Sequence, residues 1–379
     1  MTESTEGWVR GTEYSGELLT YELFWRDLSP WLEERGYVLR PRYRIGWTPS
    51  WTGTDKIYWD CEDGVRPRTW QTLDGVRTSD GAVVTFKVVS TKDHPLEVEI
   101  AQMFSAEPLA SDPHNHCVPI YEVLRHPSKA DTVLLVMPLL RAFNNPLIQT
   151  IGEAVEFFRQ VFQGLCFMHE HHVAHRDCMD LNIMMDPKPL FPKLYHPQEP
   201  RYSYDFRTSA KHSTRTSRPV KYFFIDFGLS RQYDPKDGRP REDPIRGGDK
   251  TVPEFLRSND PCDPFPTDVY YLGNMIREDF LQVFHGLEFM YPLVSQMVHD
   301  DPIRRPTMAQ VVTTFDVQRQ TLGYWKLRSR LTSTAVIFML SKDRLPTKIE
   351  QTKLNRMDFD PICSSSAISH LGYGNAILL

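Results

Sequence analysis

Two short motifs place the residue types of phosphoryl-transfer chemistry in order along the 379-residue chain. Asp177 and Asn182 lie in one motif, and Asp226 opens the triplet Asp226-Phe227-Gly228 further on. A carboxylate can accept the proton of an attacking hydroxyl, and carboxylate and amide oxygens are ligands that Mg²⁺ prefers. The sequence therefore predicts nucleotide chemistry, with Asp177 as the base and with Asn182 and Asp226 as the metal ligands.

The same motifs carry a resemblance to a known family. His175-Arg176-Asp177 with Asn182, and Asp226-Phe227-Gly228, resemble the catalytic loop and the metal-binding loop of eukaryotic protein kinases. The similarity runs from about residue 70 to residue 314, and its divergence resembles that of kinase-like proteins from mushroom-forming fungi. The resemblance implies a bilobal α+β fold, with a small antiparallel β lobe carrying one helix and a mainly α-helical large lobe. It also implies ATP and Mg²⁺ as cofactors.

One lysine and one glutamate are expected to hold the nucleotide. Residues 83–87 are mostly apolar and end in Lys87, which predicts a buried strand. Glu97 shares a predicted helix face with apolar residues three, four and seven positions later. The resemblance implies that Lys87 contacts the α and β phosphates and that Glu97 pairs with it. Glu99 is the alternative partner, and a strand-edge lysine with its head in water is the alternative for Lys87.

The apolar run 133–140 predicts a strand that meets a breaker at Pro138. In the family, this stretch forms the fifth strand and the hinge, where main-chain groups contact adenine. The resemblance places Met137 at the back of the nucleotide pocket and the Pro138 carbonyl and the Leu140 N–H beside the base. Taken alone, the run is better explained as an ordinary core strand.

A long amphipathic helix over 151–170 is expected to lead into the catalytic loop, because its apolar residues keep helical spacing. The resemblance makes His175 a structural anchor. It makes Arg176 the partner of an acidic or phosphorylated group in the activation segment, residues 226–254. The hydroxyl residues of that segment, and therefore the candidates for such a phosphate, are Ser230, Tyr233 and Thr251.

Three further residues are implied to hold the large lobe together. Glu254, in Val252-Pro253-Glu254, and Arg305 are expected to form a buried ion pair. Asp268 is expected to accept hydrogen bonds from the backbone of the catalytic loop. Each residue alone is typical of a surface charge, but their order along the chain matches the family.

The phosphate-covering glycine loop of the family is missing. Counting back from Gly81, this loop should lie near residues 65–70, where only Gly64 is close by. A loop without glycines cannot bring bare backbone close to phosphates. Arg66 and Arg68 could bind phosphate through their side chains, although two arginines beside a proline are more typical of a solvated turn.

Three single positions also depart from the family. Thr85 replaces an alanine expected on the adenine side of the pocket. Met179 replaces a catalytic-loop lysine, and Gly247 lies about where the threonine that contacts this lysine would be. Losing a cation near the γ-phosphate predicts weak activity or the use of another cation, such as Lys250.

Two length changes accompany these substitutions. The stretch from Asn182 to Asp226 contains a basic insertion, residues 187–221, which is rich in proline and hydroxyl residues. Such an insertion could recruit an acidic substrate or a phosphate group, but a solvated, mobile loop is the more ordinary interpretation. The span from Asp268 to Arg305 is short for the family, which predicts a trimmed substrate platform. The insertion carries the basic residues Lys188, Lys193, Arg201, Arg207, Lys211, Arg215, Arg218 and Lys221, against Glu199 and Asp205.

Composition is consistent with a two-lobed enzyme. The chain has 40% hydrophobic and 25% charged residues, enough for two cores, and a net charge of −5. This charge predicts no general nucleic-acid binding, and no apolar run is long enough to predict a membrane span. The polar start lacks the pattern of a secretory signal, which predicts a cytoplasmic or nuclear location. Six scattered cysteines indicate no metal cluster.

The expected domains are an N-terminal extension packed on the small lobe (1–60), the small lobe (61–140), the large lobe (141–320) and a C-terminal tail (321–379). Within the extension, Ser29-Pro30 predicts the start of a short helix. The apolar residues of the segment before it also have helical spacing.

These patterns favour an ATP-dependent protein kinase that phosphorylates a protein hydroxyl, with no motif that specifies the substrate. A pseudokinase that binds nucleotide or acts as a scaffold is one alternative, supported by the missing glycine loop and the missing cation. A small-molecule phosphotransferase of related fold is the other alternative. Glu254, Asp268 and Arg305 weigh against it, because they match the large lobe of protein kinases.

Overall fold

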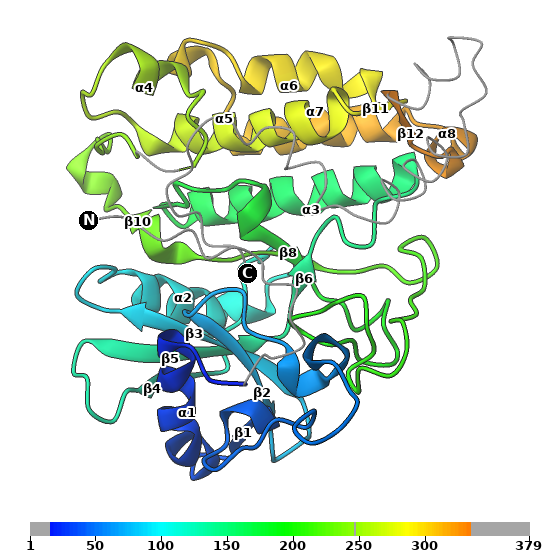
Figure 1. Ribbon diagram of the computed structural model, residues 1–379. Helices are drawn as coiled ribbons and strands as arrows, with labels where there is room; N and C mark the ends of the chain where they lie inside the picture. Colours follow the sequence, from blue (N-terminus) through cyan, green and yellow to red (C-terminus); the bar gives the residue numbers. More distant parts are fainter. Residues whose placement is uncertain (1–15, 246–247, 335–379) are drawn as a thin grey trace, which may run out of the picture.

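The computed structural model describes residues 16–245 and 248–334 and consists of two stacked lobes (Figure 1). The small lobe is built on a five-stranded antiparallel sheet, and the large lobe is mainly α-helical. The predicted bilobal α+β fold is therefore confirmed. Gly247 and the part of the expected tail from residue 335 onward lie outside the described residues.

The sheet of the small lobe has the strand order β1-β2-β3-β5-β4, and each neighbouring pair is antiparallel. Helix α2 follows β3 along the chain and lies between the sheet and the large lobe (Figure 1). The bounds of these elements are β1 Tyr37–Leu39, β2 Thr72–Arg77, β3 Val83–Ser90, β4 Glu122–Arg125, β5 Thr132–Pro138 and α2 Glu97–Ser105.

The two faces of the sheet bury different residues, because side chains alternate along a strand. Val84 and Phe86 of β3 belong to a core shared with helix α1, Thr20–Glu33, and so does Leu73 of β2. Thr85 and Lys87 therefore point to the opposite face, towards the large lobe. Register pairs Thr85 with Asp74, so the Asp74 side chain lies on that face as well.

Helix α1 and strand β1 both lie within residues 1–60. The helix runs through Pro30 without a break, whereas Ser29-Pro30 predicted a helix start. The lost backbone hydrogen bond is tolerated because Trp25 and Leu32 are fully buried against the sheet. Strand β1 is hydrogen-bonded into the sheet, so the sheet begins earlier in the chain than the expected boundary at residue 61.

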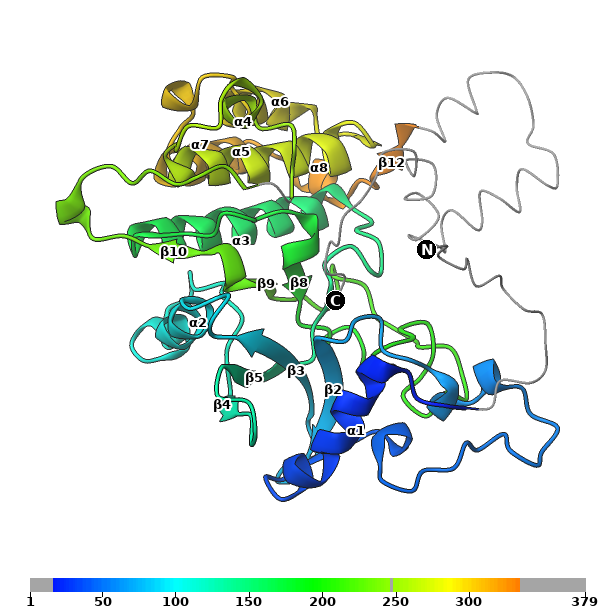
Figure 2. The ribbon, with the colours of Figure 1, turned by 60° about the vertical axis from the view of Figure 1, so that its left-hand side comes forward.

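The large lobe is organised around helix α3, Ile151–Glu170, whose first turn is capped by the Thr150 hydroxyl. Figure 2 shows α5, α6 and α7 stacked beyond α3 on the side away from the sheet. No helix of the described residues has both the length and the apolar character needed to cross a membrane. The remaining helices are α4 Pro253–Arg257, α5 Pro264–Ile276, a π-helical turn Arg277–Leu281, α6 Tyr291–Met297, α7 Met308–Gln320 and α8 Tyr324–Arg328.

Short strands complete the large lobe and carry its loops. Strands β6, β8 and β9 form a three-stranded sheet in the order β6-β8-β9, β7 pairs with β10, and β11 pairs with β12. Their bounds are β6 Arg141–Ala142, β7 Val173–Ala174, β8 Ile183–Met185, β9 Tyr222–Phe224, β10 Arg231–Gln232, β11 Phe284–His285 and β12 Thr332–Ser333.

Two long connections meet at one side of the molecule. One is the β1–β2 connection, residues 40–71, and the other is the insertion, residues 187–221, which joins β8 to β9. In Figures 1 and 2 the green insertion lies beside the blue connection. The insertion buries Leu190, Phe191 and Tyr195 in the main core, so it is packed against the protein and differs from the solvated loop favoured by its composition.

Candidate active site

Lys87 lies between two carboxylates. Its Nζ is 2.6 Å from Oε1 of Glu97 and 2.8 Å from Oδ1 of Asp226. Glu99, the alternative partner, is exposed to solvent. Burial lowers the pKa of Lys87, but the charges of Glu97 and Asp226 outweigh burial and raise it above its ordinary value. The lysine is therefore a fixed cation at this site.

The backbone presents each member of this group in a defined way. Lys87 is on β3, and Glu97 is the first residue of α2. Asp226 caps a short 3₁₀ turn, with its carboxylate accepting the Gly228 N–H at 3.2 Å and with a left-handed φ of 64°. A left-handed aspartate is uncommon, and such backbone positions are concentrated at functional sites. Burial opposes ionisation of Asp226, but Lys87 holds its pKa below the usual range.

An apolar pocket opens behind the lysine, between the lobes. Lys87 and Glu97 line it from the small lobe, and Asp226 lines it from the large lobe. Met137, expected at the back of the nucleotide pocket, is buried and lines it too. The other lining residues are Ala101, Val118, Ile120, Leu135, Ile225 and Phe227.

The expected hinge has an additional neighbour. Pro138 ends β5 and pairs with Val84 of β3. The Leu140 carbonyl accepts a hydrogen bond from the Tyr195 hydroxyl of the insertion at 3.3 Å, and both residues are buried. The insertion thus contacts the main chain that was expected to lie beside adenine.

Asp177 has one carboxylate oxygen engaged and one available. Oδ2 accepts a hydrogen bond from Nδ2 of Asn182 at 2.8 Å, whereas Oδ1 is buried and has no hydrogen-bond partner. Burial raises the pKa of Asp177 above its ordinary value, although His175 and Asn182 act in the opposite direction. An unpartnered buried acceptor is suited to receive a proton.

Two residues fix the catalytic loop, residues 175–182. The Asp268 carboxylate accepts the backbone N–H groups of His175 and Arg176, each at 2.7 Å. The His175 ring lies 3.1 Å from the Ile225 carbonyl, and so joins the loop to the strand end that precedes Asp226. The loop is thereby tied both to α5 and to β9.

Arg176 already has an acidic partner. Its guanidinium lies 3.3 Å from Oε2 of Glu242 in the activation segment, and the Tyr233 hydroxyl donates to Oε1 of the same glutamate. Ser230 is fully buried, with its hydroxyl donating to the His175 carbonyl. The sequence indicated an acidic or phosphorylated partner for Arg176 without naming Glu242, because nothing in the spacing distinguishes it from other acidic residues of the segment.

The activation segment crosses close to Asp177. A Cβ atom at Gly248 would lie 2.7 Å from Oδ1 of Asp177 and 3.2 Å from the sulfur of Met179, and Gly248 has a φ of +66°. Both the space and the backbone conformation therefore require glycine here. In the sequence, the Gly-Gly pair was the feature that could have predicted this close approach of the backbone to Asp177. Lys250, the suggested replacement cation, is exposed.

Glu254 and Arg305 form an ion pair with a separation of 2.6 Å. The Arg305 side chain is fully buried and also donates to the carbonyls of His299 and Pro266. Arg305 lowers the pKa of Glu254 despite the opposing effect of burial. The pair anchors the end of the activation segment to the large lobe.

The expected position of the glycine loop belongs to a much longer connection. Residues 65–70 are only the last part of the β1–β2 connection, which contains three 3₁₀ turns. A Cβ atom at Gly64 would lie 1.9 Å from the Tyr58 carbonyl oxygen, so this glycine serves the packing of the connection. Arg68 is exposed, and Arg66 is partly buried.

The residues present fit ATP and Mg²⁺. Asn182 makes its hydrogen bonds to Asp177 through Nδ2, which leaves its amide oxygen for a metal. The contacts of Asp226 with Lys87 and Gly228 use Oδ1, which leaves Oδ2. The main-chain carbonyl of Asn182 accepts the Ile225 N–H, so Asn182 and Asp226 lie at adjacent ends of the neighbouring strands β8 and β9. Two hard oxygen ligands beside a lysine suit a phosphate-bound Mg²⁺.

Comparison with known proteins agrees with this geometry. The family model of the protein kinase domain matches residues 71–285, more than half of the chain. The match begins at the start of β2 and contains the whole insertion. A search among curated proteins returned no match. The chain belongs to the protein kinase family.

Proposed function

We propose that this protein transfers the γ-phosphate of ATP to a hydroxyl group of a protein substrate. The observation that carries the proposal is the contact of Lys87 with both Glu97 and Asp226. A lysine with two carboxylate partners retains its charge inside a buried site, where it can bind phosphate oxygens. Asp177 lies on the same side of the large lobe, joined to this group through Asn182 and Ile225.

The proposed step assigns one role to each residue. Oδ1 of Asp177 accepts the proton of the substrate hydroxyl while the hydroxyl oxygen forms a bond to the γ-phosphorus. The bond from that phosphorus to the bridging oxygen of the β-phosphate breaks, and ADP leaves. Lys87 binds the α and β phosphates, and Asn182 and Asp226 would hold Mg²⁺. Bound there, Mg²⁺ would neutralise charge on the β and γ phosphates.

A pseudokinase is the second candidate. Met179 leaves the catalytic loop without its usual cation, and the backbone of Gly248 lies close to the oxygen of Asp177 that would accept the proton. Both observations concern the place where the substrate hydroxyl would enter. They favour a protein that binds nucleotide and transfers phosphate slowly or not at all.

A small-molecule phosphotransferase is supported less well. The Glu254–Arg305 pair and the contacts of Asp268 with the catalytic loop tie the activation segment and the loop to one helical platform. Such a platform suits a protein substrate, because it holds an extended segment beside the base. The proposal therefore keeps a protein hydroxyl as the acceptor.

Thermal melting with and without Mg-ATP, combined with radiolabelled ATP, tests the proposal. Three proteins are compared: the unmodified chain, Asp226→Asn, and Asp237→Asn as a matched control at an exposed position of the same segment. A ligand at a hundredfold excess over its Kd stabilises the folded state by about 2.7 kcal/mol. We expect a metal-dependent rise in melting temperature and label transfer in the unmodified chain and the control, and neither in Asp226→Asn.

The other outcomes separate the candidates. A rise in melting temperature without label transfer to any protein would favour the pseudokinase. Transfer to small metabolites alone would favour the small-molecule enzyme. No rise in melting temperature would contradict nucleotide binding and leave a scaffold with a kinase fold.

A further inference from the structure

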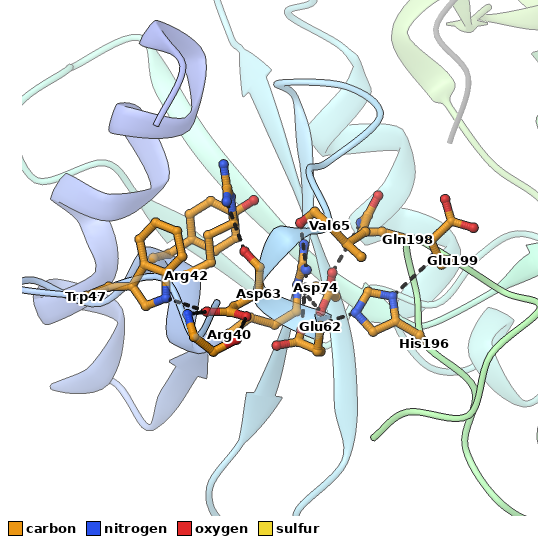
Figure 3. Close-up of polar contacts among 12 residues, drawn as sticks. Arg40, Arg42, Trp47, Glu62, Asp63, Val65, Asp74, His196, Gln198 and Glu199 are labelled. Atoms are coloured by element: carbon orange, nitrogen blue, oxygen red, sulfur yellow. Dashed lines mark hydrogen bonds and ion pairs between the residues drawn. The ribbon is translucent and has the colours of Figure 1, made fainter. Parts of the chain in front are cut away.

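The insertion crosses from the large lobe to the small lobe beside the nucleotide pocket. Nε2 of His196 lies 3.1 Å from Oε1 of Glu62. Nε2 of Gln198 lies 3.1 Å from Oδ1 of Asp74, and its Oε1 accepts the Arg68 N–H at 3.2 Å. Figure 3 shows His196 and Gln198 reaching Glu62 and Asp74 from a separate segment. Together these contacts form an interlobe latch.

The hydrogen bonds of His196 indicate which of its ring nitrogens is the donor to Glu62. The Glu199 N–H donates to Nδ1 at 3.1 Å, so Nδ1 carries no proton and Nε2 is the donor to Glu62. The His196 side chain is fully buried. Burial opposes ionisation of Glu62, but the His196 hydrogen bond and the charge of Arg40 lower its pKa. The contact is therefore a hydrogen bond from the ring of His196 to the carboxylate of Glu62.

The latch reaches the face of the sheet that carries Lys87. Asp74 lies opposite Thr85 in the β2–β3 register, and Thr72 lies opposite Lys87. Asp74 and Lys87 are thus diagonal neighbours on one face, at roughly 7–8 Å between their backbones. Gln198 therefore contacts the small lobe on its nucleotide side, next to the position where the family carries an adenine-side alanine.

The same part of the insertion is fixed to the hinge. The Tyr195 hydroxyl donates to the Leu140 carbonyl, and the Arg141 guanidinium donates to the Pro200 carbonyl at 3.1 Å. Residues 195–200 thus span from the hinge to β2. This short stretch connects the two structures between which the base and ribose of a nucleotide would lie.

The polar network of the latch is incomplete on the small-lobe side. Arg40 is buried, and its Nη1 is 3.4 Å from Glu62 and 3.2 Å from the Val65 carbonyl. Nε of Arg40 is 3.3 Å from Oδ2 of Asp74 but makes no hydrogen bond to it. Nη2 of Arg40 and Oδ2 of Asp74 also have no hydrogen-bond partner. A buried network with unsatisfied groups is less stable than a complete one. The small-lobe side of the latch is therefore not fully satisfied by its own hydrogen bonds.

We propose that His196 and Gln198 are positioning residues for the nucleotide. By holding β2 and the β1–β2 connection to the large lobe, they keep the lobes aligned without a glycine-rich loop. The apparent affinity of a ligand falls with the fraction of protein in the competent arrangement, so a latch that maintains alignment strengthens nucleotide binding. This inference rests on the proposed function, because the aligned cleft is the proposed ATP site.

Gln198→Glu is the most specific variant of the latch. It keeps the side-chain size and the acceptor for Arg68, but it replaces the donor with a carboxylate that faces Asp74 at 3.1 Å. Gln198→Ala removes the contact without adding charge. Gln296→Glu makes the same chemical change at an exposed position of α6 and serves as the control.

The measurement is the Kd of Mg-ATP by calorimetry, with hydrogen exchange of residues 62–75 followed by mass spectrometry. Losing a hydrogen bond to a charged group and adding repulsion should weaken ATP binding by roughly tenfold in Gln198→Glu. We expect a smaller loss in Gln198→Ala and none in Gln296→Glu. Exchange in 62–75 should be faster in the latch variants, while their melting temperature without nucleotide stays close to that of the unmodified chain.

Each contrary result has its own meaning. Equal ATP affinity in the unmodified chain and Gln198→Glu would overturn the positioning role and leave the proposed function intact. Tighter binding in Gln198→Glu would also overturn it, because the insertion would then obstruct the site. If the unmodified chain did not bind Mg-ATP, the proposed function would fail first, and the positioning role with it.

Discussion

The rear of the proposed nucleotide cleft and its mouth are built in different ways. At the rear, single residues from several elements converge on Lys87, and each makes a short, direct contact. At the mouth, two long segments, residues 40–71 and 187–221, replace a short glycine loop and meet through the interlobe latch. The rear contains the residues expected from the family resemblance, whereas the mouth lacks the glycine loop that the resemblance implies.

This difference reflects what each region must do. In the proposed reaction, proton acceptance and metal binding need particular atoms at particular distances, so few residue types would be acceptable at Asp177, Asn182 and Asp226. Covering a nucleotide and aligning two lobes need only a rigid surface of the right shape. Many sequences can build such a surface, and in this chain the segment 40–71 is held by buried ion pairs such as Arg42–Glu22, at 2.6 Å.

The largest expected effect comes from breaking the rear. Asp177→Asn removes the proton acceptor but keeps an oxygen that can bond to Asn182. If the rear carries the chemistry, kcat should fall by roughly 10²–10⁴, the range for loss of a general base, while Mg-ATP still raises the melting temperature. Steady-state phosphorylation assays and thermal melting check both parts. Equal kcat in Asp177→Asn would mean that another group accepts the proton.

The second prediction tests whether the platform behind the activation segment is essential for stability. Arg305→Met leaves Glu254 without its ion-pair partner in a largely buried position. Removing one partner of such a pair costs about 3–5 kcal/mol, which should appear as a lower free energy of unfolding in urea. A double variant, Arg305→Met with Glu254→Met, removes both charges and should recover a large part of this loss.

Acid should weaken the same pair. The folded-state pKa of Glu254 lies below the ordinary glutamate value of 4.5, so its contribution to stability is present above that pH. The contribution is lost as the pH falls through the lower, folded-state pKa. Unfolding measurements at pH 6 and near pH 3.5 should therefore differ less for the double variant than for the unmodified chain. An equal difference for both proteins would contradict this role of Glu254.

The rear of the cleft was the predictable part of the molecule. Lys87, Glu97 and Asp268 could be located through the family resemblance, which an apolar strand pattern, a helix face and the order of the motifs supported. The structure brings Lys87 to Glu97 and places Asp268 against the backbone of the catalytic loop. The helix expected over residues 151–170 has the same bounds in the structure, because its apolar spacing is regular from end to end.

The mouth was not predictable from local patterns. Composition favoured a mobile loop for residues 187–221, yet Tyr195 and His196 are buried, because their partners lie in distant segments. Glu62 and Asp74 are separated from His196 by more than a hundred residues, and no periodicity connects them. Likewise Pro30 indicated a helix start by its local preference, but burial of Trp25 and Leu32 decided the outcome.

A fourth prediction asks whether the missing cation of the catalytic loop limits the rate. Met179→Lys restores a cation beside Asp177, in a side chain of similar length. A positive charge near the transferred phosphate should stabilise the transition state, and we expect kcat to rise by roughly tenfold. Met179→Leu, which adds no charge, is the control. If Met179→Lys has the same kcat as the unmodified chain, the missing lysine does not limit the reaction.

The smallest expected effect concerns the activation segment, where this chain has a carboxylate in contact with Arg176. Glu242→Gln keeps the shape and the hydrogen-bond acceptor for Tyr233 but removes the charge that lies 3.3 Å from the guanidinium. A partly exposed pair of this kind contributes about 0.2–1 kcal/mol, so kcat should fall by no more than about fivefold as the segment loosens. Glu33→Gln, at an exposed position of α1, is the control.

Because Glu242 already supplies the negative charge, the unmodified protein should be active without a phosphate on its activation segment, which mass spectrometry of the active sample can verify. Activity that appears only after phosphorylation of Tyr233 or Thr251 would show that Glu242 does not replace a phosphate.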